Sequence, residues 1–98
     1  MVMRMKELNK TFVLQHASDC GVACLLSIIR YYGGSTTLQY LRELSGTTKQ
    51  GTTLLGLYQA AGQVGFDAKG CETDILSLKE HGSPVILHLV LDGKFEHY

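Results

Sequence analysis

The chain has 98 residues, 45% of them hydrophobic and 18% charged, and its nine basic and nine acidic side chains cancel. This length predicts one domain around a single core, and the composition excludes an intrinsically disordered chain. Zero net charge offers no broad electrostatic surface for nucleic acid, and the apolar run 22–29 is far shorter than the roughly 20 residues of a membrane-spanning helix.

The first elements in chain order are a short extended segment and a long buried helix. Residues 11–16 are typical of a strand or an extended loop. From Cys20 to about Tyr32 the side chains are apolar on nearly every face, until Gly33 and Gly34 end the run. We therefore expect this helix to form the axis of the core.

Two shorter amphipathic helices are predicted next, over residues 37–44 and 53–64. Each repeats apolar side chains at three- or four-residue steps, which places them on one helical face. Gly56 and Gly62 disfavour the second helix, because glycine is costly in a helix interior. Candidate capping residues are Ser35 or Thr36 and Gly46 for the first helix, and Thr52 and Gly65 for the second.

Strand signals gather in the last third of the chain. Strands are predicted over residues 66–71, 84–91 and 94–98. An Asp-Gly turn at 92–93 joins the last two as a hairpin, and a short helix over 75–81 follows Asp74 as N-cap. Because the helices precede most of the strands, the order predicts an α+β fold with segregated layers.

Cys20 stands where a polar loop meets the long apolar helix, and two interpretations of it are open. As a small apolar residue it could simply be buried. As the first helical residue it would lie among unpaired N–H groups, where the positive end of the helix dipole favours a thiolate nucleophile. Gly21 would let a substrate backbone approach, and the Gln15 amide could join the Cys20 N–H in stabilising an oxyanion.

The other two cysteines are predicted to be structural. Cys24 lies one turn inside the helix, and Cys71 ends a predicted strand. The spacing of Cys20 and Cys24 fits neither a CxxC redox motif nor a usual zinc pair, so we expect no metal and no cofactor. Three unevenly spaced cysteines and the lack of a secretory signal indicate a reducing, cytoplasmic compartment.

A cysteine nucleophile needs a base, and four histidines are candidates. His16 is expected in a solvated loop, His81 at a helix end, and His88 half-buried in a strand. His97 lies on the last strand, far in sequence from the helix, which is how a papain-like arrangement brings an imidazole to a thiol. His97 is therefore the preferred base.

At these residues the chain resembles the double-glycine leader (bacteriocin-processing) cysteine peptidase domain of peptidase-containing ABC transporters. The resemblance rests on the segments QHASDCGVAC, LLSIIRYYGG, TLQYLRELSG, GTTLLGLYQAAGQVGF, SPVILHLV and the final HY. It implies a papain-like cysteine peptidase fold, with a helical half followed by an antiparallel sheet. It also implies Cys20 as nucleophile, His97 as general base and acid, and Gln15 as oxyanion donor, with Asp19 and Gly21 flanking the nucleophile.

The resemblance further implies the substrate, the partners and the location. The substrate would be a secreted peptide precursor, cut after the two glycines that end its leader. The partners would be that leader and the transmembrane and ATP-binding domains of an ABC transporter, with the peptidase a soluble domain at the cytoplasmic face of a bacterial cell membrane and no nucleic acid involved. Residues that could hold the leader, or equally fill the core, are Leu38, Tyr40, Leu41, Leu57 and Tyr58.

One feature of the family has no match in this chain. The family's third catalytic residue is an aspartate that follows the histidine and precedes a proline, whereas Asp67, Asp74 and Asp92 all come before His97. We therefore expect residues 1–98 to be one incomplete, N-terminal peptidase fragment of a larger transporter, with weak activity by itself. A noncatalytic relative that binds and tethers the transport substrate is the alternative.

Overall fold

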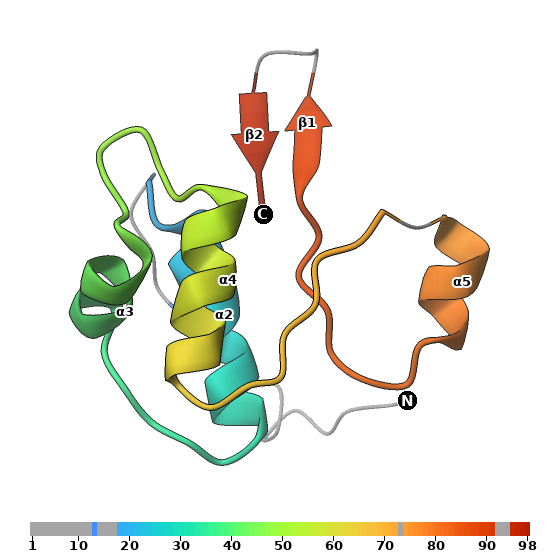
Figure 1. Ribbon diagram of the computed structural model, residues 1–98, viewed down its shortest axis with the longest axis horizontal. Helices are drawn as coiled ribbons and strands as arrows, with labels where there is room; N and C mark the ends of the chain where they lie inside the picture. Colours follow the sequence, from blue (N-terminus) through green and yellow to red (C-terminus); the bar gives the residue numbers. More distant parts are fainter. Residues whose placement is uncertain (1–12, 14–17, 73, 92–94) are drawn as a thin grey trace.

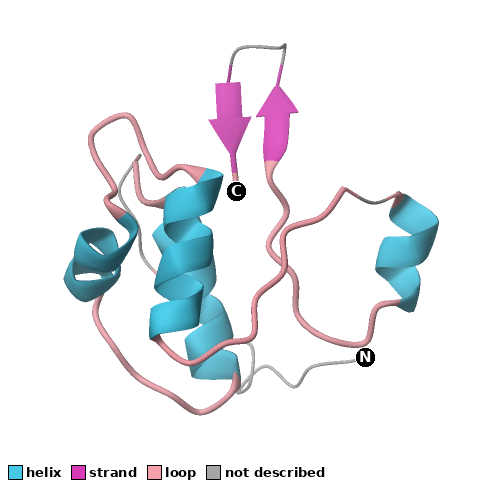
Figure 2. Cartoon of the chain, viewed as in Figure 1, coloured by secondary structure: helices cyan, strands magenta, loops and turns pink. Residues whose placement is uncertain are grey.

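The computed structural model describes residues 13, 18–72, 74–91 and 95–98 (Figure 1). Its elements are α2 (Cys20–Tyr31), α3 (Leu38–Ser45), α4 (Leu54–Gln63), α5 (Ile75–Glu80), β1 (Leu89–Leu91) and β2 (Phe95–His97). Figure 2 shows α2, α3 and α4 together on one side, with α5 and the β1–β2 pair set apart and joined to them by long loops. The predicted turn at 92–93 lies outside the described residues, as does all of the segment 11–16 except residue 13.

Helix α2 confirms the predicted central helix. Its buried residues are Gly21, Val22, Ala23, Leu25, Leu26 and Ile29. The helix ends at Tyr31, and Gly33 follows with a φ of +85°, a conformation that glycine adopts at little cost. None of the described helices has the length and apolar character needed to cross a membrane.

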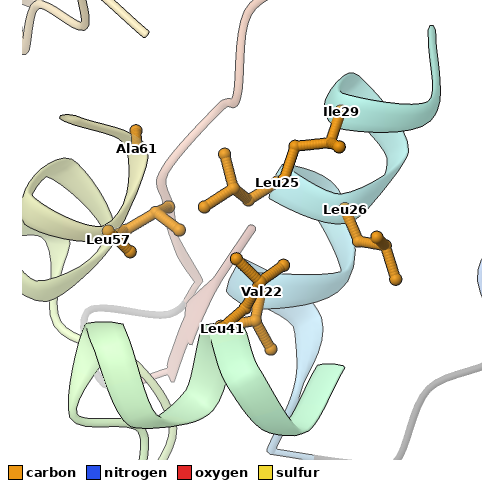
Figure 3. Packing of buried hydrophobic residues seen from close by; sticks show 8 residues of the cluster. Val22, Leu25, Leu26, Ile29, Leu41, Leu57 and Ala61 are labelled. Carbon is orange, nitrogen blue, oxygen red and sulfur yellow. The ribbon is translucent and has the colours of Figure 1, made fainter. Parts of the chain in front are cut away.

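The core lies where α2, α3 and α4 meet. Figure 3 shows Leu57 of α4 directed toward Leu25 of α2, and Leu41 of α3 beside Val22; Ala61 of α4 belongs to the same cluster. Leu41 and Val22 are 0% exposed, and Leu25 is 2% exposed. Burying each such side chain contributes about 1.5–3 kcal/mol, so this junction is the main source of stability.

Helix α3 begins at Leu38, so its N-cap lies one residue after the later of the two predicted candidates. Thr37, not Ser35 or Thr36, has the extended backbone of an N-cap, and its hydroxyl accepts a hydrogen bond from the Tyr40 N–H at 3.1 Å. Adjacent hydroxyl residues all satisfy the sequence rule, so only backbone geometry selects among them. Gly46 ends the helix with a φ of +69°, as predicted.

The N-cap of helix α4 also lies one residue later than predicted. The packing of α4 explains why residue 56 is a glycine. Thr53, not Thr52, is the N-cap, and its hydroxyl accepts from the Gly56 N–H at 3.0 Å. A Cβ at Gly56 would lie 2.1 Å from the Ser45 carbonyl oxygen. Glycine is therefore required there for α4 to pack against the end of α3.

Helix α5 confirms the prediction, whereas two predicted strands are wrong in whole or in part. The Asp74 carboxylate caps α5 by accepting from the Ser77 N–H at 2.7 Å. Residues 66–71 form no strand, and of the predicted strand 84–91 only Leu89–Leu91 is a strand, paired antiparallel with Phe95–His97. A strand requires a hydrogen-bonded neighbour, and among the described residues β1 and β2 have only each other.

Candidate active site

Cys20 is the first residue of α2, and its side chain is half-buried. The N-cap position before it is occupied by Asp19, whose side chain makes no capping hydrogen bond to the helix. An N-cap aspartate ordinarily accepts from the N–H groups of the first turn. Here those N–H groups are not engaged by the Asp19 carboxylate, so the sulfur lies at a helix end that keeps its positive polarity.

The Asp19 carboxylate is instead held by Arg42 of α3. Asp19 is 1% exposed, and its Oδ1 accepts from the Arg42 Nε–H at 2.9 Å while Oδ2 forms an ion pair with the other end of the guanidinium. This two-point geometry is the strong form of an arginine–carboxylate contact. Hydrogen bonding to Asp19 holds the pKa of Arg42 above its ordinary value. The pair ties the start of α2 to α3.

Sequence reasoning assigned no chemical step to Asp19 and did not single out Arg42. The two residues are 23 positions apart and on different helices, so no periodic pattern connects them. The one available signal was an acidic residue at the boundary of a buried helix, which needs a partner once it is buried.

The remaining cysteines differ from each other. Cys24 is half-buried, and burial raises the pKa of its thiol, with a further rise from the charge of Cys20 one turn away. This agrees with the prediction that Cys24 belongs to the core side of α2. Cys71 is exposed and in no strand, so the prediction that it is a structural strand residue is wrong.

His97 ends β2, opposite Leu89 in the strand register, and its side chain is exposed. The next residue, Tyr98, turns toward the helices: its hydroxyl donates to the Thr52 carbonyl at 2.9 Å. A Cβ built on Gly21 would lie 3.2 Å from the Tyr98 ring, so ring and backbone are in contact. The structure thus brings the chain segment of His97 against the segment of Cys20 (Figure 1).

The other predicted residues fall in different places. Gln15 and His16 lie outside the described residues. His81 is exposed at the end of α5, and His88 is half-buried and stacked on the Tyr98 ring, with centroids 4.7 Å apart and planes 17° apart. The expected setting of His81 at a helix end is confirmed, whereas His88 is half-buried as expected but lies just before β1 and not in a strand.

The candidate leader-binding residues divide between core and surface. Leu41 and Leu57 are buried, so the interpretation of these two residues as core residues is correct. They cannot line a surface patch. Leu38 packs partly buried against the same core. Tyr40 and Tyr58 are 49% and 50% exposed and stay available to a partner.

Comparison with known proteins gives concordant matches. The model of the peptidase C39 family matches residues 9–98. The chain is 37% identical over 93% of its length to the lactococcin-G-processing and transport ATP-binding protein LagD of Lactococcus lactis subsp. lactis, and covers 13% of that protein. It is 40% identical over 83% of its length to the pediocin PA-1 transport/processing ATP-binding protein PedD of Pediococcus acidilactici, and covers 12% of it.

Among solved structures, the peptidase domain of Streptococcus ComA, a bi-functional ABC transporter involved in a quorum sensing pathway, aligns with a TM-score of 0.73. The sequences are 35% identical, and the alignment covers 87% of this chain and 64% of that domain. The chain therefore matches a peptidase domain in fold, and spans a small part of the length of the transport proteins to which it is similar.

Proposed function

Because the chain belongs to the peptidase C39 family, we propose that it is a papain-like cysteine peptidase that cleaves leader peptides after a Gly-Gly site. The names of the relatives, which combine processing with transport, support this proposal. The observation that carries it is the position of Cys20 at the start of the buried helix α2, with the segment of His97 packed beside it through Tyr98 and Gly21.

The proposed chemistry assigns a role to each predicted residue. The Cys20 thiolate attacks the carbonyl carbon of the second glycine, and the developing oxyanion accepts hydrogen bonds from the Cys20 N–H and the Gln15 amide. His97 gives its proton to the leaving amine as the peptide bond breaks, leaving the leader as a thioester on Cys20. His97 then takes a proton from water, which attacks the thioester, releases the leader acid and restores the thiol.

The proposed partners follow from the same relatives. The substrate is a secreted peptide precursor, and the peptidase acts beside the transmembrane and ATP-binding domains of an ABC transporter, at the cytoplasmic face of the cell membrane. Residues 1–98 belong to the peptidase part of such an assembly. Cleavage after glycines fits a site that excludes side chains beside the thiol, because rejection by steric clash gives specificity without added contacts.

The test is cleavage of a model precursor whose leader ends in Gly-Gly by the chain extended past Tyr98, since residues 1–98 hold no match for the family's aspartate after the histidine. Cys20→Ala should abolish cleavage while leader binding and the folded state persist, and Gln15→Ala should lower kcat about 10²- to 10³-fold. Cys71→Ser is the matched control, because it removes an exposed thiol away from the helix start and should retain full activity.

Two outcomes contradict the proposal. Leader binding without cleavage, even by the chain extended past Tyr98, would establish the tethering role instead. Loss of folding in Cys20→Ala would mean that this thiol serves packing, as in the alternative interpretation of the sequence.

A further inference from the structure

Tyr98 makes three contacts with three separate parts of the chain. Its hydroxyl donates to the Thr52 carbonyl at 2.9 Å, just before α4. Its ring lies against Gly21, so closely that a Cβ there would be 3.2 Å from the Tyr98 Cδ2. The His88 ring also stacks on the Tyr98 ring, with the ring centroids 4.7 Å apart. Tyr98 therefore joins the end of β2 to α2, to the α3–α4 loop and to the segment before β1.

The acceptor of the Tyr98 hydroxyl is itself fixed. Thr52 is 6% exposed, and its hydroxyl shares a hydrogen bond with Thr47 at 2.6 Å. The Thr47 hydroxyl is hydrogen-bonded in turn to Ser45, the last residue of α3, at 2.7 Å. This chain of hydroxyl groups connects the Tyr98 anchor to the helical body.

The strand that carries His97 needs such an anchor. Among the described residues β2 pairs only with β1, and an isolated two-stranded pair is marginally stable in water. The His97 side chain is exposed, so packing of the imidazole itself does not fix it. Side chains alternate between the two sides of an extended segment, so an inward Tyr98 leaves His97 at the surface, where a substrate could reach it.

We propose that Tyr98 is a positioning residue of the proposed peptidase: by seating the end of β2 against Gly21 and Thr52, it fixes where β2 presents the His97 imidazole relative to the Cys20 thiol. The inference rests on the proposed function, since it assumes that Cys20 and His97 act together. Gly21 has a part in it, because a residue without a side chain lets the ring reach the first turn of α2.

The experiment measures the rate at which iodoacetamide alkylates Cys20 between acidic and neutral pH. Peptide mass spectrometry separates Cys20 from Cys24 and Cys71. An imidazolium beside Cys20 keeps thiolate present at acidic pH, so the unmodified protein should react there, and His97→Ala should react appreciably only at higher pH. The other titratable groups near the thiol, namely Asp19 with Arg42, and Cys24, are the same in all variants, as is His88 beside Tyr98.

Tyr98→Leu removes the hydroxyl and the ring, and its alkylation profile should move to that of His97→Ala. Its kcat for a Gly-Gly precursor should fall about 100-fold, as expected when a catalytic group is misplaced by about 1 Å, while KM stays near its original value. Tyr98→Phe keeps the ring against Gly21 and should shift the profile only part of the way. Gly21→Ala adds a Cβ 3.2 Å from the Tyr98 ring and 3.3 Å from the Thr52 Cβ, so the ring must shift slightly and the profile should move part of the way.

The outcomes separate the two proposals. A folded Tyr98→Leu protein with the unmodified alkylation profile, while His97→Ala is shifted, overturns the role of Tyr98 and leaves the Cys–His pair intact. An unmodified protein and His97→Ala that react alike at every pH overturn both. Should Tyr98→Leu fail to fold, Tyr98→Phe and Gly21→Ala decide: unchanged profiles in both overturn the inference.

Discussion

The body formed by helices α2, α3 and α4 is built differently from the segment 66–98. All of the buried hydrophobic side chains among the described residues lie between 22 and 61, in that body. From residue 66 onward no described side chain is fully buried, and contact with the core comes from partly buried Phe66, Ala68, Ile86 and Tyr98. The proposed nucleophile thus belongs to the part that packs well, and the proposed base to the part held by a few anchors.

The largest effect is expected from truncating one leucine in each region, which tests whether buried side chains stabilise the helical body more than the segment 66–98. Leu41→Ala removes a side chain that is 0% exposed and should lower the free energy of unfolding by about 2–5 kcal/mol. Leu76→Ala is the control in α5, where the side chain is 74% exposed, and should change it by less than about 0.5 kcal/mol. Denaturant unfolding measures both, and equal losses would show that the two regions share one core.

The next test uses two glycines of α4. A Cβ at Gly56 would lie 2.1 Å from the Ser45 carbonyl oxygen, so Gly56→Ala must move backbone and should cost about 1–3 kcal/mol. A Cβ at Gly62 would meet nothing within 4 Å, so Gly62→Ala should stabilise by about 0.5–1 kcal/mol through helix propensity. Opposite shifts of the thermal midpoint are expected; a stabilised Gly56→Ala would mean that α3 and α4 are not in close contact.

The helical body could be predicted from the sequence because its signals are local. Apolar periodicity places α2, α3 and α4, and Gly33 and Gly46 mark two of the ends with positive φ. The N-caps were misplaced by one residue because Ser and Thr occur in runs before α3 and α4. Local sequence could not show that residues 66–71 and the first part of the predicted strand 84–91 form no strand, since an apolar run becomes a strand only beside a neighbour.

For the site, the sequence predicts a thiol at a helix start, which is a local feature, and Cys20 is found there. The Asp19–Arg42 pair and the Tyr98 contacts with Gly21 and Thr52 join residues far apart in the chain. Such contacts depend on how the elements assemble, and a single sequence carries no period or spacing that reveals them.

Arg42 connects the helical body to the candidate site, so its removal sharpens the contrast between the two regions. Arg42→Ala removes the two-point contact with the buried Asp19 carboxylate, and a loss of about 1.5–3 kcal/mol for hydrogen bonds to a charged group should lower the thermal midpoint by roughly 10 °C. Arg42→Lys keeps the charge but cannot make the two-point contact, so its thermal midpoint should lie between those of the unmodified protein and Arg42→Ala. A midpoint unchanged in Arg42→Ala would show that the pair contributes nothing to holding the start of α2.

The smallest effect is expected at the other extreme of the comparison, in the exposed helix α5. The Ser77 N–H donates to the Asp74 carboxylate, and this hydrogen bond lowers the pKa of Asp74. A lowered folded-state pKa means that the cap acts fully above the unfolded value of about 3.9 and is lost as pH falls through the folded value. The Ser77 amide resonance should therefore titrate below the ordinary aspartate range, and Asp74→Asn, which retains a cap without a charge, should abolish that titration. Because none of the described side chains of α5 packs in the core cluster, its acid-induced fraying should leave the resonances of α2 and α3 unchanged. Concerted loss of all helices would contradict the separation of the two regions.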